Sequence, residues 1–141
     1  MGYLDTFNAV VGETLMYCQR IEHDIKVIYA AMLKGEMDGN LDLVRRETLG
    51  TVLVALENLD FSDNNPMFSR EDYRLLKEIK NIRNFIAHQC YVDFLYLDDY
   101  NFNLKLDQNY QKICDFNMKM KKLSNFVETA RFSVLEKYNR I

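Results

Sequence analysis

Apolar residues recur every three or four positions along most of this chain, and the longest such run lies near its beginning. The run comprises Phe7, Val11, Thr14, Cys18, Ile21, Ile25, Ile28 and Met32. That spacing places them on one face of a helix of about seven turns. The 141 residues include five glycines and one proline, so helix breakers are few. The pattern predicts a helical protein rather than a sheet with many turns.

Three further segments show the same spacing. Residues 41–59 carry Leu49, Val52, Leu53, Leu56 and Leu59. Residues 69–97 read mostly as helix, and Ser69 with Asp72 three residues later resembles a capping box at its start. The last segment, about 107–138, carries Ile113, Phe116, Met120, Leu123, Val127, Ala130, Val134 and Tyr138. Turn formers at 34–40 and 60–66 separate the first three helices. We therefore predict one all-α domain over residues 1–141, an antiparallel four-helix bundle, with Gly50 marking close approach to a neighbouring helix.

Residues 91–104 support two interpretations. The stretch is rich in aromatic and β-branched residues, and residues 102–106 alternate between apolar and polar. We favour a helix that continues through about Tyr96. The alternative is a short irregular segment or hairpin near 97–104, turning around residues 98–101.

The composition excludes several classes of protein. With 48% hydrophobic and 28% charged residues, the chain can form an ordered core. It has neither a signal-peptide pattern nor an apolar run of membrane-spanning length, so we expect a cytoplasmic protein without a membrane partner. The three cysteines are widely spaced and none forms a metal-binding pair, which argues against a disulfide framework. We expect no metal and no cofactor.

The charge is unevenly distributed. Residues 105–141 contain eight Lys/Arg and four Asp/Glu, whereas the rest of the chain contains ten and 17. A basic final segment on an acidic body can steer a polyanion towards the protein. A solvated helix face beside an acidic neighbour is the equally favoured interpretation.

The predicted helix over residues 69–97 has two faces of different character. Within about 60° of Ile79 lie Leu75, Ile82, Ile86 and Cys90, which form a stripe that faces the core. The opposite side carries Asn81, Asn84, His88 and Tyr91, spaced by three, four and three residues. Arg83 lies between the two faces. A polar stripe with apolar borders indicates a surface for a second partner.

The segment Arg83-Asn84-Phe85-Ile86-Ala87-His88 resembles the R-x4-6-H signature of the HEPN superfamily (higher eukaryotes and prokaryotes nucleotide-binding domains). The resemblance implies a helical domain that forms a homodimer, with a composite endoribonuclease site at the interface. Its catalytic residues would be Arg83, His88 and Asn84, while Asn81 and Tyr91 would bind RNA or line the interface. The family's biological context is toxin–antitoxin or phage-defence systems.

The residue types suit RNA cleavage without a metal ion. RNA supplies its own nucleophile, the 2′-OH, and histidine titrates near neutrality and can move its proton. Arg83 can hold the charge of the transition state, and Asn84 can orient the imidazole or contact phosphate. The products would be a 2′,3′-cyclic phosphate and a 5′-hydroxyl. Five residues separate Arg83 from His88, so on an ideal helix they diverge by roughly 140°, which favours a site completed by a second copy.

Two alternatives to an active nuclease stay open. One is a catalytically inactive HEPN-like module that binds nucleotide, RNA or protein, and the other is a helical interaction protein in which the motif is fortuitous. A toxin branch of the family carries R-x4-H-x-Y, and its tyrosine is modified by a partner nucleotidyltransferase antitoxin. Here Cys90 holds that position and the tyrosine is Tyr91. This departure from the pattern argues against modification of Tyr91 by a partner nucleotidyltransferase, while an antitoxin protein of another kind stays a possible partner.

Overall fold

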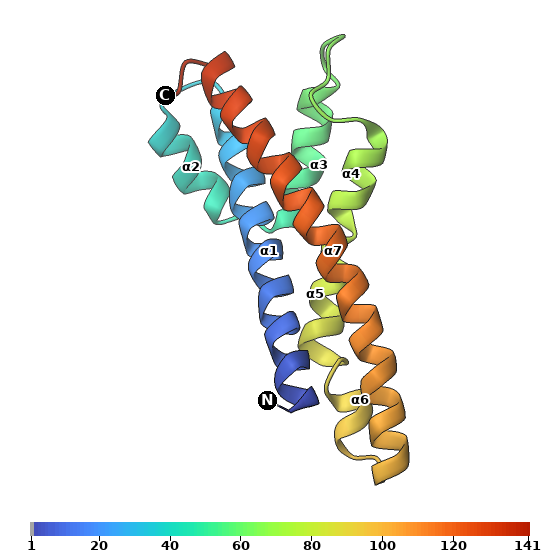
Figure 1. The fold of residues 1–141 in the computed structure, drawn as a ribbon. Coiled ribbons are helices and arrows are strands. Elements are labelled where there is room, and N and C mark those ends of the chain that lie inside the picture. The colour runs from blue at the N-terminus through green and yellow to red at the C-terminus, as the bar shows by residue number, and fades with distance from the viewer. Residues whose placement is uncertain (1) are drawn as a thin grey trace.

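The computed structural model describes residues 2–141 as seven helices joined by short connections (Figure 1). They are α1 (Tyr3–Met32), α2 (Met37–Arg45), α3 (Leu49–Asp60), α4 (Arg70–Lys77), α5 (Ile79–His88), α6 (Val92–Leu95) and α7 (Asp99–Lys137). These residues contain no strand, which confirms the predicted all-α class. In the same range, no helix is both long and apolar enough to span a membrane.

The two long helices, α1 and α7, lie side by side and run in the same direction (Figure 1). At one end, Tyr3 Oη donates a hydrogen bond to Asp107 Oδ1 at 2.8 Å. Near the other end, Arg140 Nε donates to the carbonyl oxygen of Ala31 at 3.2 Å. The two contacts join residues 104 and 109 positions apart, and only parallel helices keep this separation nearly constant.

The segment from α4 to α6 runs opposite to α1 and α7. Arg83 contacts Glu22, whereas Tyr91, further along the segment, contacts Asn8, nearer the start of α1. The order is also reversed against α7, since Phe85 packs against Phe116, whereas Cys90, further along the segment, accepts a hydrogen bond from Asn109 Nδ2, nearer the start of α7. The segment from α4 to α6 therefore packs antiparallel to both long helices.

The prediction of one helix over residues 41–59 is wrong. The chain reverses between α2 and α3, and Thr48 caps the new helix by accepting a hydrogen bond from the Thr51 N–H at 3.2 Å. This additional reversal changes the direction of every later element. The last helix consequently runs parallel to the first, and not antiparallel to it as we predicted.

The prediction for residues 69–97 is right at its start and wrong at its end. Ser69 and Asp72 form the predicted capping box, but α4 and α5 are separated at Glu78, and α5 ends at His88. The predicted helix through Tyr96 does not form, and no hairpin follows; of residues 97–104, only 97 and 98 lie outside a helix. Instead, α6 is a single short turn, and α7 begins at Asp99 because the Asp98 side chain caps it.

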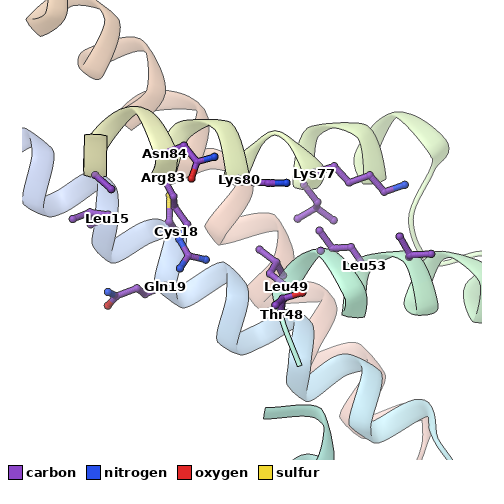
Figure 2. Close-up of a pocket in the computed structure, with 14 residues that line it drawn as sticks. Leu15, Cys18, Gln19, Thr48, Leu49, Leu53, Lys77, Lys80, Arg83 and Asn84 are labelled. Carbon is purple, nitrogen blue, oxygen red and sulfur yellow. The ribbon is translucent and has the colours of Figure 1, made fainter. Parts of the chain in front are cut away.

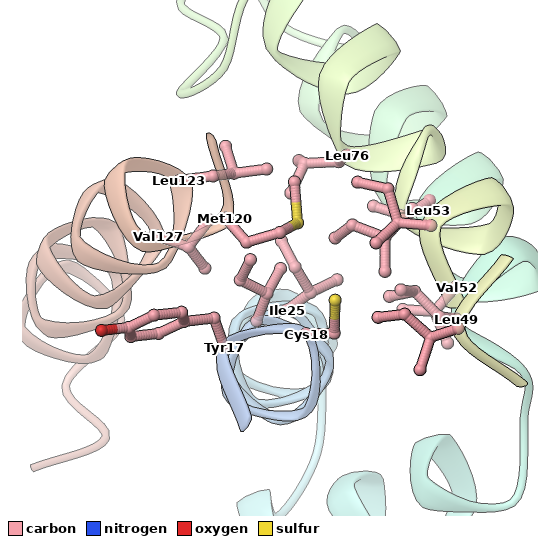
Figure 3. Close-up of a cluster of buried hydrophobic side chains, with 14 of the residues drawn as sticks. Tyr17, Cys18, Ile25, Leu49, Val52, Leu53, Leu76, Met120, Leu123 and Val127 are labelled. Atoms are coloured by element: carbon pink, nitrogen blue, oxygen red, sulfur yellow. The ribbon is translucent and has the colours of Figure 1, made fainter. Parts of the chain in front are cut away.

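A continuous apolar core joins the helices and fixes the orientation of α5. The predicted stripe residues Ile79, Ile82, Ile86 and Cys90 are buried, which confirms that this face points inward. Leu75, which we placed in the same stripe, is only half-buried. Figure 3 shows the centre of the core, where side chains of α1, α3, α4 and α7 meet. With one face of α5 held in this way, its other side faces solvent.

Candidate functional site

The helix α5 presents all three predicted catalytic side chains at the surface. Arg83, Asn84 and His88 are exposed, and so is Asn81 one turn before Asn84. His88 is the last residue of α5. The prediction that these residues lie off the apolar stripe is therefore confirmed.

His88 lies in an open depression between α5 and α7. The depression has a volume of about 470 Å³ and is lined by Asn81, Asn84, Phe85, His88, Gln89, Lys112 and Phe116. Lys112 Nζ is 4.2 Å from the centre of the Phe85 ring, which is packed edge-on against Phe116 at 5.8 Å. The electrons of an aromatic face attract an ammonium group held over it. A cation and an aromatic pair therefore accompany His88 and Asn84.

Arg83 points the other way, towards α1. Its Nη1 lies 2.6 Å from Glu22 Oε1, and 46% of the arginine side chain remains exposed. Glu22 also lies 3.7 Å from Lys26 Nζ, so its charge is shared between two cations. The Arg83 guanidinium is thus engaged on the opposite side of α5 from the His88 depression.

A larger cavity of about 700 Å³ lies on the Arg83 side, between α1, α3 and the α4–α5 segment (Figure 2). Arg83 lines this cavity but not the depression that holds His88, whereas Asn84 lines both. One chain therefore does not bring Arg83 and His88 into a single site. This separation agrees with the divergence of roughly 140° that the five-residue spacing of Arg83 and His88 predicts for an ideal helix.

Gly50 at the start of α3 lines this cavity, and the sequence-based interpretation of it is wrong. We expected a close helix contact there. A Cβ atom added to Gly50 would instead meet no atom within 4 Å. The glycine marks open space, which spacing alone does not distinguish from close packing.

Tyr91 is separated from the other predicted site residues. Because α5 ends at His88, the spacing of three, four and three does not continue to Tyr91. Its Oη donates a hydrogen bond to Asn8 Oδ1 at 2.7 Å, and its ring packs edge-on against Phe7 at 5.3 Å. Burial raises the pKa of the Tyr91 hydroxyl, and the neighbouring Cys90 adds to the effect. Tyr91 joins α6 to α1 in this structure.

No metal-binding cluster competes with the α5 site in the described chain, and two of the three thiols are buried. Residues 2–141 contain no group of three or more His, Cys, Asp or Glu side chains placed to hold a metal ion. The cysteines are free, and burial raises the pKa of the Cys18 and Cys90 thiols to about 11. Both thiols stay protonated near neutral pH and are poor nucleophiles. The second histidine, His23, contacts Asp24 on α1.

Sequence reasoning missed Lys112. It belongs to the basic final segment, whose excess charge was visible, but nothing in the spacing within α7 singles it out. Only the packing of α7 on Phe85 places this lysine beside His88. The packing of α7 on α5 therefore places a lysine in the depression, which Arg83 of the same chain does not line.

Comparisons with known proteins assign neither a family nor a known fold. No family model, no characterised protein and no solved structure matches the chain. Function is therefore inferred from the side chains of α5 and their surroundings.

Proposed function

We propose that the protein is a metal-independent endoribonuclease of the HEPN type, with a helical bundle fold of that superfamily. The observation that carries the proposal is the depression in which His88 and Asn84 lie beside Lys112 and Phe116. It combines a proton-transfer group, an amide, a cation and an aromatic ring. These are the groups that would hold and cleave a single RNA strand.

In the proposed reaction, the imidazole of His88 takes the proton of the ribose 2′-OH. The 2′-oxygen forms a bond to phosphorus, and the bond from phosphorus to the 5′-oxygen breaks. The leaving oxygen takes a proton from an imidazolium, giving a 2′,3′-cyclic phosphate and a 5′-hydroxyl. Lys112 offsets the negative charge of the phosphate, and Asn84 hydrogen-bonds to phosphate or to the imidazole.

A second copy completes this site in the proposal. Arg83 faces α1 in its own chain, so the arginine that stabilises the pentacovalent phosphorus would come from a partner across a two-fold axis. Asn81 lines the same depression as His88 and would contact RNA or the partner. The biological setting we propose is a toxin–antitoxin or phage-defence system, with an antitoxin protein as a further partner.

One observation favours a second candidate function. Arg83 is bound to Glu22 at 2.6 Å, so its charge is offset by a neighbouring carboxylate. If that ion pair persists in the assembled protein, the Arg83 guanidinium cannot bind a phosphate, because Glu22 already occupies it. The protein would then be a HEPN-like module that binds RNA or a protein without cleaving it.

The chain offers a matched pair of variants to test the proposal, because it contains only two histidines. Purified His88→Ala should cleave single-stranded RNA about 10²- to 10⁴-fold more slowly than the wild type, the usual contribution of a general acid–base group. His23→Ala should cleave at the wild-type rate, because His23 lies on α1 away from the depression. Cleavage should persist in EDTA and stop when the scissile ribose carries a 2′-O-methyl group.

Three results would each count against this function. They are cleavage that needs added Mg²⁺ or Mn²⁺, equal rates for the two histidine variants, and cleavage of the 2′-O-methyl substrate. RNA binding by a wild-type protein that cuts nothing would select the second candidate. Circular dichroism of each preparation shows whether a slow variant is still folded.

A further inference from the structure

The cavity on the Arg83 side of α5 is built like a small-molecule site. Its volume of about 700 Å³ lies within the range of about 300–1,000 Å³ typical of ligand pockets. Apolar side chains from three elements line it, including Leu15 of α1, Leu53 of α3 and Leu76 of α4. Figure 2 shows the side chains from α1, α3 and the α4–α5 segment that line it. The apolar lining fits the body of a ligand rather than a chain of phosphates.

All the charged residues that line the cavity are cations, and they lie on one wall. Lys77, Lys80 and Arg83 come from the α4–α5 segment (Figure 2). Lys77 Nζ lies 2.6 Å from Glu57 Oε1, and Arg83 is held by Glu22. Lys80 forms no ion pair within residues 2–141, so its charge is available to a ligand.

Gly50 keeps space free beside this wall. It lies in the first turn of α3, where a residue with a side chain would have a higher helix propensity. Because an added Cβ would meet nothing within 4 Å, neither packing nor a positive φ requires glycine there. Gly50 therefore leaves space at the edge of the cavity that a side chain would occupy.

We propose that this cavity binds a small amphipathic anion, with its apolar body among the leucines and its single anionic group on Lys80. The site is separate from the His88 depression, and the inference goes beyond RNA cleavage. Asn84 lines both the cavity and the His88 depression. A ligand in the cavity would therefore contact α5, the helix that carries His88, on the side away from His88.

The probe for this site is decanoate, with decan-1-ol as its uncharged counterpart. Titration calorimetry on the full chain should show decanoate binding at least tenfold more tightly than decan-1-ol. Lys80→Met should weaken decanoate binding about tenfold, the size of one charged hydrogen bond, and leave decan-1-ol binding unchanged. Lys121→Met is the matched control, since it removes the same charge from an exposed position on α7 that does not line the cavity.

A third variant, Gly50→Leu, tests the cavity itself. It should weaken binding of both probes at least tenfold without lowering the melting temperature, because the new side chain enters open space. Methyl NMR of leucine-labelled protein locates the probe. Decanoate should shift the signals of Leu15 and Leu53 and leave the exposed Leu95 and Leu104 unchanged.

The proposal is overturned if decanoate shifts the exposed leucines instead of the cavity leucines. Equal weakening by Lys80→Met and Lys121→Met would also overturn it, as would undiminished binding to a folded Gly50→Leu protein. None of these results depends on RNA cleavage. The nuclease proposal can therefore fail while the cavity proposal stands, and the reverse also holds.

Discussion

Cys18 and Cys90 show how the surroundings of single residues change their chemistry. Both side chains are fully buried, and desolvation raises the pKa of each thiol from 9.0 to about 11. Arg83 acts in the opposite direction on Cys18, but burial has the larger effect. Neutral thiols suit the apolar core, so we assign both cysteines a structural part.

The raised thiol pKa predicts a loss of stability in alkali. Below about pH 9 the thiol is protonated in both the folded and the unfolded chain. Between pH 9 and 11 the unfolded chain releases this proton while folded Cys18 keeps it, so unfolding becomes easier. Each cysteine should contribute up to about 2 kcal/mol to this loss in the free energy of unfolding. Urea unfolding at pH 8, 9, 10 and 11 measures it.

Cys18→Ala provides the comparison. The substitution lowers stability at every pH because it removes buried volume, but the fall between pH 9 and 11 should become shallower. Cys90 and four tyrosines whose pKa is also raised, Tyr3, Tyr73, Tyr91 and Tyr110, contribute to the fall that remains. An unchanged slope in Cys18→Ala would show that this thiol does not titrate differently in the two states.

At the residue scale, the sequence predicted the direction in which a side chain points better than the residues that it contacts. The spacing of Arg83 and His88 predicted that their side chains point in different directions. In the structure, Arg83 lines the larger cavity and His88 lines the depression between α5 and α7. It could not predict that Glu22, 61 positions away, would bind Arg83. Nor could it predict Lys112 beside His88, since both contacts depend on how helices distant in sequence pack.

Among the elements, the connection between α3 and α4 is held by one buried carboxylate. Asp60 ends α3, is 3% exposed, and accepts hydrogen bonds from the Met67 N–H, the Phe68 N–H and the Tyr73 hydroxyl. The three bonds hold the 61–69 loop and α4 against α3. These hydrogen bonds offset the free-energy cost of burying the Asp60 carboxylate.

Asp60→Ala should therefore lower the free energy of unfolding by about 3 kcal/mol, because it leaves two backbone N–H groups and a buried hydroxyl without an acceptor. Asp63→Ala in the same loop should cost about 0.5 kcal/mol, because Asp63 is exposed and accepts one local hydrogen bond. Urea unfolding measures both variants. Equal effects would contradict the assigned anchoring of the loop.

The boundaries of elements were predictable where a side chain caps a helix in a familiar pattern. Ser69 with Asp72 marked the start of α4, and the isoleucine spacing in α5 predicted its buried face. The reversal before Thr48 was missed because residues 45–47 contain neither glycine nor proline. The Thr48 cap was the available signal, and the apolar periodicity on both sides of it obscured that signal.

For the whole molecule, that single missed reversal decides the topology. Helices α1 and α7 run parallel along most of their length, with the segment from α4 to α6 antiparallel to both (Figure 1). Periodicity gives the faces of helices but not their directions, which depend on the number of reversals between them. The arrangement leaves the outer side of α5 uncovered, and there we propose that the second copy docks.

The shared site of the proposed dimer can be tested by mixing two inactive variants. Arg83→Ala and His88→Ala should each be nearly inactive, and light scattering should show that both form dimers. After subunit exchange, each mixed dimer contains one site with the arginine of one chain and the histidine of the other. An equimolar mixture should therefore recover roughly a quarter of the wild-type rate of RNA cleavage. A mixture no more active than either variant alone, beside an active wild type and confirmed exchange, would contradict a site shared between two copies.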